Sequence, residues 1–151
     1  MHLIDILTLV VAGLMVGNEL TVSLFINPVM RRLDADAQRQ ALSLFASILG
    51  RVMPFWYALC LILFLVETFV YHGRPEFYAL LAASILWAGI IVFTVTTLVP
   101  INNRISALSS GAPLERWLPE HKLWERLHRF RILLLLAALV LVTHALLTSH
   151  R

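Results

Sequence analysis

The chain has 151 residues, of which 60% are hydrophobic and only 14% are charged. About a quarter of the residues of a soluble domain are charged, so this composition excludes an ordinary water-soluble fold and predicts a single transmembrane domain over residues 1–151. The net charge is +3. Because the basic residues adjoin apolar segments, they indicate membrane topology, and we expect no nucleic-acid partner.

Four apolar segments are long enough to cross a membrane, since a transmembrane helix needs about 20 residues. Their apolar residues run on without the alternation that is typical of strands. The sequence therefore predicts an all-α, integral membrane four-helix bundle in the lipid bilayer. The predicted spans are residues 6–30, 53–71, 77–99 and 132–148.

The segment between the first two spans, residues 33–52, has apolar residues at helical spacing. Asp34 is its predicted N-cap, and Gly50 and Pro54 indicate a break or kink at its end. We therefore expect an interfacial amphipathic helix between spans one and two. The alternative is that this segment extends the second helix.

The basic residues are distributed unevenly between the connections. Ten of the twelve Lys and Arg residues lie within residues 31–52 and 100–131. Cytoplasmic connections carry an excess of positive charge. The sequence thus predicts that loops 31–52 and 100–131 are cytoplasmic and that both termini are outside.

An acidic residue, Glu19, lies near the middle of the first predicted span. A carboxylate at that depth costs a few kcal/mol unless it is paired, protonated or hydrated. Ser23 and Asn27 follow at i+4 and i+8, so the three side chains are expected to form one polar stripe. The stripe either fixes the bundle by hydrogen bonding or forms a substrate-binding wall on which Glu19 binds ligand or carries a proton.

Two further ionisable residues lie inside predicted spans, Glu67 in the second and His144 in the fourth. Their depths are comparable, and ionisable groups in membranes usually pair. We expect a structural Glu67–His144 pair. Haem binding would need a second histidine facing His144, and none is apparent in the sequence.

The connection before the fourth span contains a concentrated set of polar and aromatic residues. Trp124, His128 and Arg131 are spaced i, i+4, i+7, so they lie on one face of a helix that runs into the span. Asn102 and Asn103 end the third span on the same side of the membrane. These residues form either an interface anchor or a site.

As a site, this set suits proton abstraction from a flat, acidic, phenol-like molecule. Arg131 favours a neutral His128 imidazole, which can accept a proton near neutral pH. Asn102 and Arg131 would hold a phenolate or enolate oxygen, and Trp124 would provide a stacking wall. No spacing typical of metal ligands accompanies these residues, so we expect no metal.

Several short motifs, taken in order, resemble those of the anthrone oxygenase family. They are Gly13 and Gly17 in the first span, Asn27-Pro28 at its end, Pro100-x-Asn102, and Trp124-x-x-x-His128-x-x-Arg131. The resemblance covers essentially the whole chain. It implies oxidation of an anthrone to an anthraquinone with molecular oxygen, without metal or flavin.

The resemblance assigns the catalytic positions to Asn102, Trp124, His128 and Arg131, whereas Glu19 has no place in the family pattern. The predicted partners are a small lipophilic aromatic substrate (anthrone- or quinol-like) and molecular oxygen. We expect no cofactor, and a homo-oligomer is possible. The alternative class is a non-enzymatic membrane protein, a small transporter or an assembly or partner subunit, that uses the Glu19 stripe.

Overall fold

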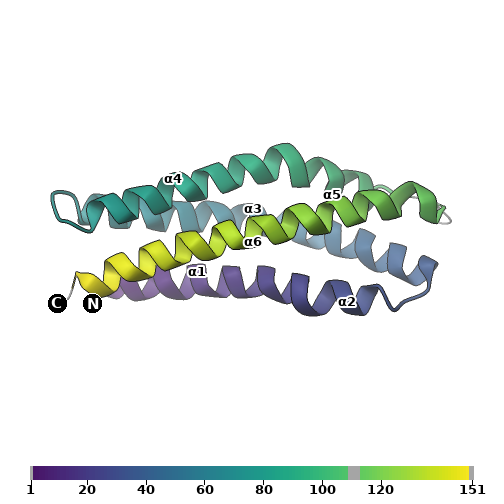
Figure 1. The fold of residues 1–151 in the computed structure, drawn as a ribbon, viewed down its shortest axis with the longest axis horizontal. Coiled ribbons are helices and arrows are strands. Elements are labelled where there is room, and N and C mark those ends of the chain that lie inside the picture. Colours follow the sequence, from purple (N-terminus) through teal and green to yellow (C-terminus); the bar gives the residue numbers. More distant parts are fainter. Residues whose placement is uncertain (1, 109–112, 150–151) are drawn as a thin grey trace.

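The computed structural model describes residues 2–108 and 113–149. Four long helical segments lie side by side and alternate in direction, so that the start of the first and the end of the last lie at the same end of the bundle (Figure 1). All four are long and apolar enough to cross a membrane. The prediction of an all-α four-helix bundle is confirmed, while its sidedness stays a prediction.

Two of the four segments are single helices and two contain a π-helical turn. The first segment comprises α1 (Leu3–Thr21), η1 (Val22–Ile26) and α2 (Asn27–Met30), and the second is the single helix α3 (Ala35–Val70). The third segment comprises α4 (Phe77–Phe93), η2 (Thr94–Leu98) and α5 (Val99–Ser106), and the fourth is the single helix α6 (Leu114–Thr148). With 36 and 35 residues, α3 and α6 are each about 50 Å long. The hydrocarbon core is about 30 Å thick, so both helices extend beyond it.

The interfacial helix predicted for residues 33–52 is not a separate element. Helix α3 begins directly after the Asp34 cap, whose side chain accepts a hydrogen bond from the Ala37 N–H at 3.0 Å. It then continues through Pro54 to Val70, near the end of the second predicted span. The prediction of an interfacial helix is wrong, and the alternative, an extension of the second helix, is what the structure has.

Packing explains why α3 continues past its proline. The early part of α3 contributes Leu42 and Ala46 to a buried apolar cluster with Ile101 and Ile105 of α5 and Trp117 of α6. This contact holds the segment in line with the rest of the bundle. Burying five such side chains outweighs the hydrogen bond that a helical proline removes.

The two π-helical turns occupy equivalent positions in their segments. Each is followed by one residue and then a proline, Pro28 after η1 and Pro100 after η2. The Asn27 N–H donates to the Val22 carbonyl, and the Val99 N–H donates to the Thr94 carbonyl. A π-helical turn accommodates one extra residue and is frequent at functional sites. Both turns help to line the cavity described below.

Candidate active site

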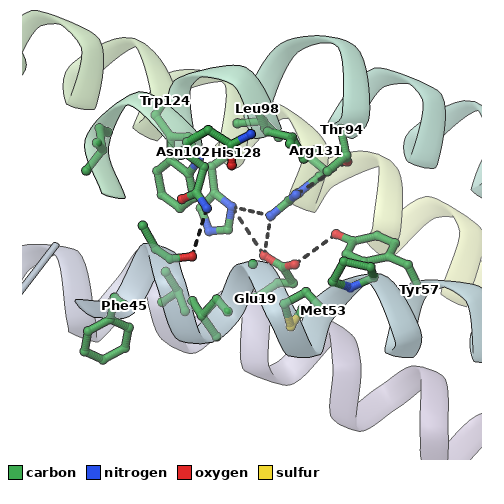
Figure 2. A pocket seen from close by; sticks show the side chains of 18 of the residues that line it. Glu19, Phe45, Met53, Tyr57, Thr94, Leu98, Asn102, Trp124, His128 and Arg131 are labelled. Atoms are coloured by element: carbon green, nitrogen blue, oxygen red, sulfur yellow. Dashed lines mark hydrogen bonds and ion pairs between the residues drawn. The ribbon is translucent and has the colours of Figure 1, made fainter. Parts of the chain in front are cut away.

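A buried carboxylate, Glu19 of α1, is at the centre of a polar network between α1, α3 and α6. Arg131 Nη2 donates to Glu19 Oε2 at 2.7 Å, and the Tyr57 hydroxyl donates to Glu19 Oε1 at 2.9 Å (Figure 2). Both charged side chains are almost fully buried. A buried charge is tolerated only when it is paired and hydrogen bonded, and this arrangement meets both conditions.

The His128 imidazole lies next to this ion pair and is fully buried. Its Nδ1 is 2.9 Å from Arg131 Nη2 and 3.3 Å from Glu19 Oε2 (Figure 2). Its Nε2 is buried and has no hydrogen-bond partner among the residues that the structure describes. One ring nitrogen is therefore held by charged groups, and the other is available to a ligand.

The group that bonds to Nδ1 determines what Nε2 of His128 can do. A guanidinium only donates, so when Nδ1 accepts from Arg131 the neutral ring carries its proton on Nε2. When Nδ1–H instead donates to Glu19, Nε2 has a free lone pair and can act as a base. Because Nδ1 lies within reach of both groups, the site can present either a donor or a base.

Trp124 packs against imidazole rings. Its ring is stacked on His128 at a centroid distance of 4.6 Å and an interplanar angle of 13°. His121, one turn earlier, is stacked with it at 6.2 Å and 12°. Trp124 therefore orients His128, and it also lines the cavity described below. A stacking contact between Trp124 and a substrate stays a prediction.

The two asparagines of α5 differ in position. Asn102 is half-buried, and its Nδ2 donates to the Ala46 carbonyl of α3 at 3.0 Å. A Cβ atom at Gly50 would lie 3.4 Å from the same Nδ2, which is an ordinary contact distance. Asn103 is exposed. Asn102 therefore ties α5 to α3 in addition to lining the cavity.

These groups surround one cavity of about 280 Å³, which is close to the lower end of the usual range for small-molecule sites. Most of its wall is apolar, with Met53 and Leu98 among the lining side chains (Figure 2). Pro54 of α3 and Val95 of η2 line it and are also exposed on the bundle surface. The cavity thus opens at the side of the bundle between α3 and η2.

The structure brings seven of the eight predicted site residues to this cavity. They are Glu19, Asn27, Asn102, Asn103, Trp124, His128 and Arg131. Ser23 is half-buried and does not line it; the buried Val22 lines it instead. The π-helical turn explains this difference, because its extra residue changes which side chains face inward.

Comparison with known families agrees with this arrangement. A sequence model described as anthrone oxygenase matches residues 42–141. The chain belongs to the anthrone oxygenase family. Neither curated proteins nor solved structures give a significant match.

The part of the chain that matches the anthrone oxygenase family includes every residue of the network except one. Tyr57, His128 and Arg131 lie inside the match, and Glu19 lies before it. In space, however, Glu19 bonds directly to Arg131 and Tyr57. The Glu19 stripe and the His128 face, which the sequence presents as rival features, therefore contribute to a single site in this anthrone oxygenase family member.

Sequence reasoning missed three residues of this site. Tyr57 bonds to Glu19, and Thr94 accepts from Arg131 Nη1 at 3.4 Å. Both contacts join different helices, and no spacing within one helix indicates them. His121 could have been found, because it precedes Trp124 by three residues and so extends the same helical face.

The predicted Glu67–His144 pair is wrong. Glu67 is fully buried, and its Oε1 accepts a hydrogen bond from the Thr8 hydroxyl at 2.7 Å. His144 is exposed, because its position on α6 faces away from the bundle. The prediction failed because it assumed that His144 faces the bundle, whereas its side chain is exposed.

Proposed function

We propose that this protein is a membrane-bound oxygenase that oxidises a small, lipophilic, anthrone-like aromatic with molecular oxygen and no resident cofactor. The observation that carries the proposal is the Nε2 atom of His128, which is buried and unpartnered among the described residues at the wall of a largely apolar cavity. Burying such a polar atom is costly unless a ligand completes its hydrogen bonding. Membership of the anthrone oxygenase family supports the reaction class.

The substrate chemistry fits the cavity. An anthrone is flat and apolar apart from its carbonyl oxygen, and it dissolves in lipid. The opening between α3 and η2 gives such a molecule a path from the bilayer that avoids water. Molecular oxygen, which is also apolar, can follow the same path.

In the first step, Nε2 of His128 takes a proton from the methylene carbon opposite the anthrone carbonyl. The electron pair moves through the ring to the carbonyl oxygen and gives an anthrolate anion. The imidazolium formed is stabilised by Glu19, which is 3.3 Å from Nδ1. Arg131, with its buried Nε unpartnered among the described residues, supplies positive charge for the anion.

In the second step, the electron-rich carbon reacts with molecular oxygen. The anion transfers one electron to oxygen and the two radicals combine, forming a carbon–oxygen bond. The peroxide takes the proton back from His128 and becomes a hydroperoxide. Loss of the remaining methylene hydrogen with cleavage of the O–O bond gives the second carbonyl and one molecule of water. Anthrone and oxygen thus yield anthraquinone and water.

The proposal is tested by oxygen uptake of the purified protein in lipid nanodiscs with anthrone. The rate is corrected for spontaneous oxidation with heat-denatured protein. We expect His128→Phe, which keeps a ring against Trp124, to lower the protein-dependent rate by at least about 100-fold, the usual contribution of a general base. A His128→Phe rate equal to that of the wild type would contradict the assignment, and an absence of protein-dependent uptake would contradict the function.

A further inference from the structure

A second polar set lies on the other side of Trp124. Arg31, directly after α2, donates from Nη1 to both carboxylate oxygens of Glu125 of α6, at 2.9 and 3.1 Å. His121 Nε2 lies 3.4 Å from Glu125 Oε1. We call these three residues the Glu125 set, and Glu19, His128 and Arg131 the Glu19 set.

The two sets repeat one arrangement. In each, an arginine holds a glutamate, and a histidine ring nitrogen lies just over 3 Å from that glutamate. In each, one charged partner comes from the first helical segment or its end, and the histidine comes from α6. Trp124 is stacked with both histidines. The imidazoles therefore stand on either side of one indole along the same helix face.

His121 has unused hydrogen-bonding capacity, as His128 does. It is 2% exposed, and neither of its ring nitrogens has a hydrogen-bond partner within the described part of the chain. Its side chain lines the same cavity as His128. A buried histidine that only supported the fold would be expected to use both ring nitrogens in hydrogen bonds. Nε2 lies 3.4 Å from Glu125 Oε1, but that carboxylate is already held in a two-point contact by Arg31, and Nδ1 has no hydrogen-bond partner among the described residues.

The spacing of the two histidines sets a length. Seven residues separate His121 from His128, which is about 10 Å along the helix axis. A fused-ring aromatic whose reacting carbon faces His128 can therefore bring an oxygen of an outer ring near His121. Asn102, which also lines the cavity, is already bonded to Ala46. Both histidines contribute ring nitrogens that are unpartnered among the described residues.

We propose that His121 is a second anchoring residue, which binds a polar group on an outer ring of a flat aromatic ligand whose reacting carbon lies at His128. This inference rests on the proposed function, since it assigns the ligand of the same cavity. It identifies the ligand class as fused-ring aromatics that carry a hydrogen-bonding oxygen on an outer ring. The Glu125 set then selects the ligand, and the Glu19 set acts on it.

The test compares two probes with the same ring system, 9,10-anthraquinone and 2-hydroxyanthraquinone. Their binding to purified protein in nanodiscs is measured by calorimetry, without turnover. We expect the wild type to bind the hydroxylated probe about threefold to tenfold more tightly, the contribution of one hydrogen bond. His121→Phe, which keeps the ring against Trp124, should bind both probes equally. His121→Gln should recover part of the preference.

The matched control is His144→Phe, which changes an exposed histidine on the same helix and should keep the full preference. Equal binding of the two probes by the wild type would overturn the proposal. Retention of the preference by His121→Phe, or the failure of both probes to bind, would do the same. If the preference behaves as expected but anthrone causes no oxygen uptake, the anchoring role of His121 stands and the proposed reaction fails.

Discussion

The Glu19 set and the Glu125 set contain the same three residue types but differ in their contact with solvent. In the Glu19 set the arginine side chain is 8% exposed, whereas in the Glu125 set it is 51% exposed. The Glu19 carboxylate has an additional donor, Tyr57. Charges interact far more strongly away from water. The same chemical groups can therefore perform proton transfer in one set and ligand selection in the other.

The largest expected difference between the sets is in stability. Arg131→Met leaves the buried Glu19 carboxylate without its cation, which should lower the free energy of unfolding by about 3–5 kcal/mol. Arg31→Met removes a half-exposed arginine but leaves Glu125, whose side chain is 8% exposed, without its cation, so it should cost less, about 1–3 kcal/mol. Thermal unfolding of the two variants in the same detergent compares these costs. Equal destabilisation would mean that the greater solvent exposure of Arg31 makes no difference to the strength of its pair.

The next difference concerns the rate. Glu19→Gln removes the carboxylate that accepts Nδ1–H of His128, so it should slow anthrone-dependent oxygen uptake by at least about 100-fold. Glu125→Gln, the matched change in the other set, should alter the maximal rate by less than about threefold, since that glutamate does not contact His128. If Glu125→Gln were the slower variant, the roles of the two sets would have to be exchanged.

A smaller effect is expected at Tyr57, whose hydroxyl donates to Glu19 at 2.9 Å. Tyr57→Phe removes one hydrogen bond, worth about 1 kcal/mol, and should lower the maximal rate about fivefold. Tyr78→Phe provides the control, because Tyr78 is exposed and should behave as the wild type. An unchanged rate in Tyr57→Phe would mean that Glu19 does not need this donor during the reaction.

The smallest effect is expected at Trp124, which touches both sets. Trp124→Phe keeps an aromatic ring between the imidazoles and should lower kcat about twofold to threefold, since part of the stacking energy is retained. KM for anthrone should be unchanged, because the close stacking contact of the indole is with His128. Steady-state oxygen uptake over a range of anthrone concentrations separates the two constants. A rise in KM with constant kcat would indicate direct substrate stacking instead.

The parts of the fold and site that were predictable from sequence depend on local spacing. The long apolar runs gave the four spans, and the i, i+4, i+7 spacing placed Trp124, His128 and Arg131 on one inward face. These features depend on residues that are close together in the chain. They are fixed by helix geometry alone.

The features that were missed depend on contacts between distant segments. Glu19 and Arg131 are 112 residues apart, and no pattern in either helix specifies the other. The interfacial helix was predicted from Gly50 and Pro54, but packing of α3 against α5 overrode their local preference. Ser23 was misplaced because a π-helical turn cannot be recognised from i+4 spacing.

The central claim is that the Glu19–His128–Arg131 site inserts oxygen into a lipophilic aromatic. It is tested most directly by incubating the purified protein in nanodiscs with anthrone under oxygen-18 gas and analysing the anthraquinone by mass spectrometry. The account predicts one labelled oxygen atom per product molecule, formed by the wild type well above the spontaneous background and by His128→Phe only at that background. Equal amounts of labelled anthraquinone from wild type and His128→Phe would contradict it.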